Sequence, residues 1–266
     1  MENKSQSIIE NENAVKLEKL FKAARNARDT SDAKTAIKHY EEISMLEPNS
    51  WEALFYLVIL KTETVKYGEI SNSAISVLNC LPKVFEIVNN TITDETKKKE
   101  IVREIVDQCN ETTVWLVTVS GKYYNELTSN NLSFDLMTAA VRADAKRNAR
   151  YESAKRMANI GNIMCICGNL IEQYFDLNDV FYQNLAVKCW KGMLDTHFGH
   201  IQYYKVAVFN EESIAKIGAK IKRFEPAYEI SNLKATEKSS YAIKAILIAL
   251  GVFALSALWC LWFWFF

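Results

Sequence analysis

Two cysteines that lie two residues apart, Cys165 and Cys167, are the first side chains whose chemistry suggests a site. Thiolate sulfur is a preferred zinc ligand, but a zinc site needs four converging ligands, commonly from CxxC pairs in turns. Residues two apart on a helix point about 200° away from each other. Apolar neighbours such as Ile163 and Leu170 indicate a buried helix. We therefore expect both thiols in the core and no metal site.

The second candidate is a pair of histidines, His197 and His200. Two imidazoles three residues apart can bind a metal with a third ligand, such as Cys189 or Asp195. No general base of the HExxH kind accompanies them, and Gly199 lies between them at an expected helix end. The pattern favours a helix cap or a surface pair over a metal site.

The third candidate, which we assign to partner binding, is a basic stripe defined by Arg142, Lys146 and Arg150. These residues are four apart, so they line one face of a helix. Such a stripe can contact phosphates, anionic lipid or an acidic partner. Tyr151 is the one aromatic ring close by in sequence, so stacking on single-stranded nucleic acid is poorly supported. The alternative is a solvated helix surface without a partner.

The sequence contains no recognisable motif for nucleotide binding or catalysis. It lacks the P-loop pattern, a GxGxxG after a strand, and the GxSxG of hydrolases. The chain has 32 basic and 32 acidic residues, so its balance of charge gives no indication of a nucleic-acid partner. We therefore expect a protein that is not an enzyme, binds no cofactor and does not bind nucleic acid.

Glycine and proline are scarce, at 8 and 3 of the 266 residues. Sandwiches, barrels and α/β folds need many turns and glycine-containing loops, so this scarcity favours long helices with few connections. The β-branched run 114–119 is compatible with a strand, but a helical stripe of apolar residues passes through it. We therefore expect an all-α body of about eight or nine helices.

Capping residues and prolines set the expected helix boundaries. Candidate N-caps precede the apolar runs at 29–32, at Thr93 and Asp94, at Asn178 and Asp179, and at 210–213. Pro82 falls within an apolar run, so it is expected to kink or restart a helix. The region 134–175 is expected to form two helical segments around a polar middle.

Residues 17–65 contain a pattern of small, aliphatic and aromatic side chains followed by a turn with a proline. Its members are Leu20, Ala23, Ala24, Ala27, Ala36, Ile37, Tyr40, Leu46, Glu47, Pro48, Asn49 and Trp51. The alanines let two antiparallel helices approach closely, Tyr40 fills the gap beside them, and Pro48 turns the chain. This pattern resembles one tetratricopeptide (TPR) repeat running into the next helix. It departs from the family at Ala27, where an aromatic is usual, and at Ile43, where Ala is usual.

The resemblance implies a TPR-like helical stack or bundle whose surface binds a protein or peptide. At least three stacked units are usually needed for stability, so the later helices must pack on this one. The domain prediction is therefore a disordered start (1–12), TPR-like helices (13–67), a helical body packed on them (68–226) and a linker (227–240). The rest of the chain is similar to uncharacterised bacterial helical proteins. This resemblance does not point to any particular activity.

The last region, 241–266, is predicted to be a transmembrane tail anchor. The 22 residues from Ala245 to Phe266 carry no charge, and a helix of them spans about 33 Å, the thickness of a bilayer core. The residues assigned to the membrane are Lys244, Gly251, Trp259, Trp262 and Trp264. Lys244 reaches the near interface, the tryptophans favour the far one, and Gly251 belongs to a weak helix-packing face.

Taken together, these features predict a membrane-anchored scaffold or adaptor. Its body is expected in the cytoplasm, because the start of the chain lacks the charged and apolar regions of a secretory signal. The expected partners are a protein or peptide and the membrane, including anionic lipid; the pattern also allows a homo-oligomer. The alternative is a membrane-disrupting effector, in which the body senses a signal or oligomerises and the Trp-rich tail acts on the bilayer.

Overall fold

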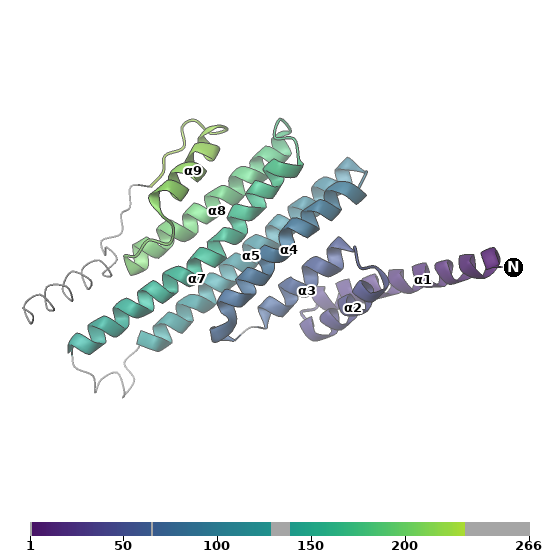
Figure 1. The fold of residues 1–266 in the computed structure, drawn as a ribbon, viewed down its shortest axis with the longest axis horizontal. Helices are drawn as coiled ribbons and strands as arrows, with labels where there is room; N and C mark the ends of the chain where they lie inside the picture. Colours follow the sequence, from purple (N-terminus) through teal and green to yellow (C-terminus); the bar gives the residue numbers. More distant parts are fainter. Residues whose placement is uncertain (1, 65, 129–138, 232–266) are drawn as a thin grey trace, which may run out of the picture.

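The computed structural model describes residues 2–64, 66–128 and 139–231 (Figure 1). The predicted anchor, with Lys244, Gly251, Trp259, Trp262 and Trp264, lies outside these ranges, as does most of the predicted linker. Within the described ranges, none of the helices combines the length and the apolar character that a bilayer crossing requires.

The described residues form eight α-helices and one short 3-10 helix, with no strand among them. The predicted all-α class is therefore confirmed for these ranges. The elements are α1 (Glu2–Asp29), α2 (Ala33–Leu46), α3 (Trp51–Glu63), η1 (Tyr67–Glu69), α4 (Ile70–Thr91), α5 (Glu95–Thr128), α7 (Ala139–Tyr174), α8 (Val180–Tyr204) and α9 (Glu211–Lys222).

The helices pack side by side in the order of the chain (Figure 1). Each contacts the next, and further contacts join α3 to α5, α5 to α8, and α4 to α7. These contacts between alternate helices arrange α3, α5 and α8 in one layer and α4 and α7 in another. Each helix thus buries its apolar stripe against close neighbours in the stack, and one apolar core runs from α1 to α9.

Local capping explains where several helices begin. The Asp32 carboxylate accepts a hydrogen bond from the Thr35 N–H (3.1 Å). The Asp179 carboxylate accepts from the Phe181 N–H (2.9 Å), and the Asn210 side chain accepts from the N–H of Ser213 (2.8 Å). Such caps satisfy otherwise unpaired N–H groups and contribute about 1 kcal/mol each. The starts predicted at Asp32, Asp179 and Asn210 are therefore confirmed.

Three features differ from the sequence-based expectation. Pro82 lies within a continuous α4, so the expected restart of the helix at this residue does not occur. Helix α7 is one helix of 36 residues that continues through the polar middle, where two segments were expected; residues 134–138 of that expectation lie outside the described ranges. Helix α1 begins at Glu2, where disorder was predicted over 1–12.

Gly168 brings α7 and α8 into close contact. A Cβ atom on this residue would lie 2.6 Å from Nε1 of Trp190 and 3.1 Å from the backbone oxygen of Ala186. Real Cβ atoms do not approach other atoms so closely, so only glycine fits here without a shift. The indole of Trp190 is fully buried against this gap.

Candidate functional site

The cysteine pair lies on α7, as the sequence predicts. Cys167 is fully buried, whereas Cys165 is half-buried. A hydrogen bond with Cys109 and burial raise the pKa of Cys167, and burial raises the pKa of Cys189 well above its usual range. Among the described residues, no group of three or more His, Cys, Asp or Glu side chains is arranged to hold a metal ion. Cys109, Cys167 and Cys189 lie in the core, whereas Cys165, which was expected there too, is only partly buried.

The histidine pair corrects the sequence-based interpretation. His197 and His200 are neither a cap nor a surface pair, because α8 continues to Tyr204 and both rings are buried. Nδ1 of His197 accepts a hydrogen bond from the Phe209 N–H (3.1 Å). The ring nitrogens of His200 lie 2.8 Å from the Val206 carbonyl oxygen and 3.2 Å from Oγ of Ser153.

These hydrogen bonds explain why the chain buries two polar rings. They fix the loop after α8 onto the helices and satisfy backbone groups that would otherwise be buried without a partner. Burial lowers the pKa of His197 to about 4, and the neighbouring His200 adds to the effect. Burial also lowers the pKa of His200. The rings are therefore neutral structural groups at pH 7.

The basic stripe of Arg142, Lys146 and Arg150 lies on the first half of α7. All three side chains are half-buried, which differs from a fully solvated face. In this half of α7 the neighbouring helix is α5 (Figure 1). Partner binding by the stripe stays a prediction.

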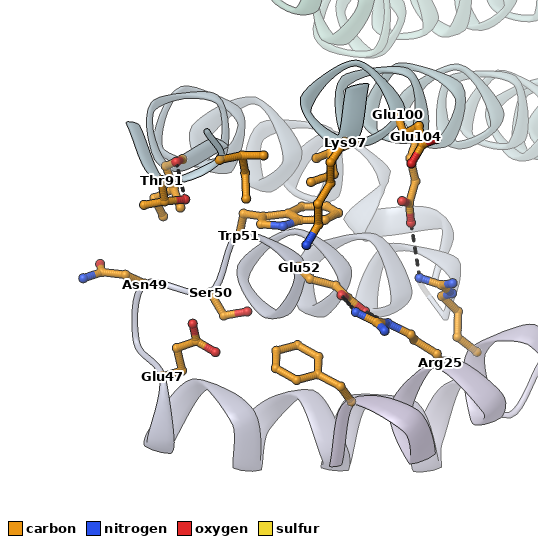
Figure 2. A pocket seen from close by; sticks show the side chains of 15 residues that line it. Arg25, Glu47, Asn49, Ser50, Trp51, Glu52, Thr91, Lys97, Glu100 and Glu104 are labelled. Atoms are coloured by element: carbon orange, nitrogen blue, oxygen red, sulfur yellow. Dashed lines mark hydrogen bonds and ion pairs between the residues drawn. The ribbon is translucent and has the colours of Figure 1, made fainter. Parts of the chain in front are cut away.

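A groove that was not predicted opens beside α1, α3 and α5, with a volume of about 610 Å³ (Figure 2). Helix α1 contributes Phe21 and Arg25, and α3 contributes Trp51 at its first turn. Lys97 and Glu100 come from the first turns of α5. The connection between α2 and α3 and the end of α4 close the remaining side.

One wall of the groove is built on Glu52 of α3. Its two carboxylate oxygens accept hydrogen bonds from Nε (2.9 Å) and Nη2 (2.5 Å) of Arg25 on α1. The hydroxyl of Tyr40, fully buried on α2, also donates to Glu52 (3.0 Å). The Glu52 side chain is 6% exposed and that of Arg25 is 54% exposed. The hydrogen bond to Glu52 raises the pKa of Arg25, and burial raises that of Tyr40.

A parallel arrangement joins α1 and α3 to α5. The hydroxyl of Tyr56 on α3 donates a short hydrogen bond to Glu104 of α5, and Nη1 of Arg28 lies 3.5 Å from the same carboxylate oxygen. The Arg28 guanidinium also lies over the Tyr56 ring, 4.2 Å from its centroid. The rings of Tyr40 and Tyr56 stack with centroids 5.6 Å apart. These contacts hold the three helices in fixed positions.

The groove keeps several side chains available for a ligand. Among the described residues, no ion pair engages Lys97, Glu100 or Glu47. Lys97 extends into the groove near the half-buried indole of Trp51 (Figure 2). The described lining contains no His or Cys, and the hydroxyl of Ser50 already caps α3. This chemistry suits binding and offers no nucleophile paired with a base.

Comparison with protein-family models, with curated proteins and with solved structures finds no match for this chain. The groove itself is therefore the basis for a functional proposal. The sequence did contain a signal for it. Arg25 and Arg28 directly follow the buried Ala24 and Ala27 on α1, and Glu52 occupies a buried position of α3. Charged residues at such positions need partners from other helices.

Proposed function

We propose that this protein is a non-catalytic scaffold or adaptor that binds a protein or peptide in the groove beside α1, α3 and α5. The observation that supports this function is the combination of a fixed groove with unpaired charged groups and aromatic surface. The pairs Arg25–Glu52 and Arg28–Glu104 order the walls before any partner arrives. Binding to an ordered surface costs less conformational entropy than binding to a mobile one.

We also propose that α1, α2 and α3 are a TPR-like unit. In its support, Ala24 and Ala36 are fully buried, as a close contact between α1 and α2 requires. Tyr40 fills the space beside them, and the connection through Pro48 leads directly into α3. The groove borders alternate helices of the stack, and repeat proteins with stacked helices use such extended surfaces to bind partners.

The lining chemistry suggests a partner segment with both apolar and charged side chains. The rings of Phe21 and Trp51 offer apolar surface, and large aromatic residues often dominate the energy of protein interfaces. Lys97 and Glu100 are close enough in sequence to face one segment, and they select for charges of opposite sign. A segment of a few residues would fill a groove of about 610 Å³.

Crosslinking from the groove tests this function. A photoreactive amino acid at Asn49, which lines the groove, should crosslink a specific protein when the full chain is expressed in its native host. The reversed charges of Lys97→Glu with Glu100→Lys should abolish that crosslink. The matched control Lys83→Glu lies on α4 outside the groove lining and should leave the crosslink intact. Equal crosslinking in the charge-reversed and control variants would contradict the proposal.

The second part of the proposal is that residues 241–266 anchor this body to a membrane. Its support is the uncharged run from Ala245 to Phe266. The full chain should stay with the membrane pellet after washing at alkaline pH, whereas a chain ending at residue 231 should leave it. A full chain that is released by the wash would exclude an integral anchor and leave the groove proposal unaffected.

A further inference from the structure

A second cavity, of about 300 Å³, lies between α5 and α8, with Met157 of α7 in its lining. It shares no lining residue with the groove beside α1 and α3. Its surface is mainly apolar and aromatic, with Val117 on α5 and with Tyr203 and Tyr204 on α8. We refer to it as the α5–α8 cleft. Small-molecule sites have this character, an apolar concave surface with few polar groups.

Two glycines on facing helices keep the cleft open. A Cβ atom on Gly199 of α8 would meet no other atom within 4 Å, and one on Gly121 of α5 would meet only the Tyr204 hydroxyl oxygen, at an ordinary 3.6 Å. Glycine inside a helix is destabilising relative to alanine. Packing within the described chain does not require glycine at either position, in contrast to Gly168. The missing side chains therefore leave space that the described part of the chain does not fill.

The one charged residue in the described lining of the α5–α8 cleft is Asp195. No described residue forms a hydrogen bond or ion pair with its carboxylate. Lys191, one turn earlier on α8, pairs instead with Glu225, at 2.6 Å. Asp195 is an exposed residue, and desolvation of its carboxyl raises its pKa against the opposing effect of the Lys191 charge. The hydroxyl of Tyr204 likewise has no hydrogen-bond partner among the described residues.

Most of the other polar groups around the cleft are already engaged. Both ring nitrogens of His200 have partners, and the hydroxyls of Thr118 and Thr196 donate to backbone carbonyls of their own helices. The guanidinium of Arg156 is only partly engaged: its Nε donates to Ser120 (3.3 Å) and its Cζ lies 5.0 Å from the centroid of the Tyr123 ring, whereas its Nη2 is buried without a hydrogen-bond partner among the described residues. Arg156 is not part of the lining.

We propose that the α5–α8 cleft binds a small organic cation with an apolar body, such as an aromatic or aliphatic amine. The ammonium group pairs with Asp195, and the apolar part occupies the space left by Gly121 and Gly199. The rings of Tyr203 and Tyr204 provide electron-rich faces that attract a cation. A volume of about 300 Å³ suits a single-ring ligand.

The test uses two probes of similar size and opposite charge, 2-phenylethylamine and 3-phenylpropionate. The purified full chain in lipid nanodiscs is titrated with each by calorimetry, and the heat from empty nanodiscs is subtracted. The amine should bind at one site per chain, and Asp195→Asn should weaken it about two- to fivefold, as expected for loss of one exposed charge pair. The matched control Glu211→Gln, an exposed acidic residue of α9, should not change the affinity.

A second variant separates binding from folding. In Gly199→Leu the new side chain enters open space, so the variant should still fold. Its unfolding temperature should equal or exceed that of the original protein, while amine binding is lost. Amine binding that persists in Gly199→Leu, or that Asp195→Asn leaves unchanged, would overturn the proposal. Tighter binding of 3-phenylpropionate would also overturn it, because an anion would be recognised by Arg156 and not by Asp195.

Discussion

The guanidinium of Arg25 on α1 forms two hydrogen bonds with the carboxylate of Glu52 on α3, 27 residues later in the chain. The acid is almost fully buried, whereas half of the base is exposed. Glu52 also accepts from the fully buried Tyr40, so one carboxylate joins α1, α2 and α3. These contacts fix the wall of the groove, so a substitution of Glu52 should lower the stability of the protein.

Glu52→Ala should lower the free energy of unfolding by about 1–3 kcal/mol, because the Tyr40 hydroxyl is left buried without its partner. Half of the Arg25 side chain can still contact water, which limits the loss. Urea unfolding followed by circular dichroism measures the effect. The matched control Glu41→Ala removes an exposed partner of Lys61 and should cost less than about 0.5 kcal/mol. Equal losses of unfolding free energy in the two variants would show that Glu52 does not hold the three helices together.

Gly168→Ala should destabilise the protein by about 1–3 kcal/mol, because the added methyl overlaps the fully buried Trp190 and forces a shift of α7 against α8. Gly199→Ala is the control: its methyl meets open space, and the better helix propensity should stabilise the protein by up to about 1 kcal/mol. Thermal unfolding compares the two. A neutral Gly168→Ala would mean that Trp190 can move at little cost.

Stability should fall as the pH drops from about 6.5 toward 4. The folded state holds the pKa of His197 at about 4, below its usual 6.5, because burial disfavours the charged form of the ring. A group with a lowered folded pKa contributes its full stability above the unfolded pKa and loses it as the pH falls through the folded value. The loss for His197 is up to about 3 kcal/mol. His200, whose pKa is also lowered, acts in the same direction.

Urea unfolding at a series of pH values checks this expectation. Asn at position 197 keeps an acceptor for the Phe209 N–H but does not titrate in this range, so His197→Asn should flatten the curve between pH 6.5 and 4. Asp32 and Asp179 have lowered pKa values too, but they start from 3.8, so their effect begins at lower pH. An unchanged slope in His197→Asn would assign the pH dependence to other groups.

Local sequence signals gave a good account of the helices. The starts at Asp32, Asp179 and Asn210 were predictable because a cap depends on residues only two or three positions apart. The helical reading of 114–119 holds because apolar periodicity outweighs β propensity within α5. The burial of Cys167 followed from its apolar neighbours.

Contacts between residues that are far apart in the sequence could not be predicted from such local signals. The histidine pair was assigned to a helix cap or surface because nothing near it in sequence shows that Ser153, 47 residues earlier than His200, meets its ring. The continuity of α7 was missed because its polar first half is held by α5 and not by an apolar stripe of its own.

The sequence by itself determined the all-α class and most helix boundaries, because helical hydrogen bonds, caps and periodicity involve residues within one or two turns. The tertiary structure decided the groove and the α5–α8 cleft. Their walls come from α1, α3, α5 and α8, and periodicity states which face of a helix is buried but not which helix covers it. The contact of Arg25 with Glu52 appears only when the stack is assembled.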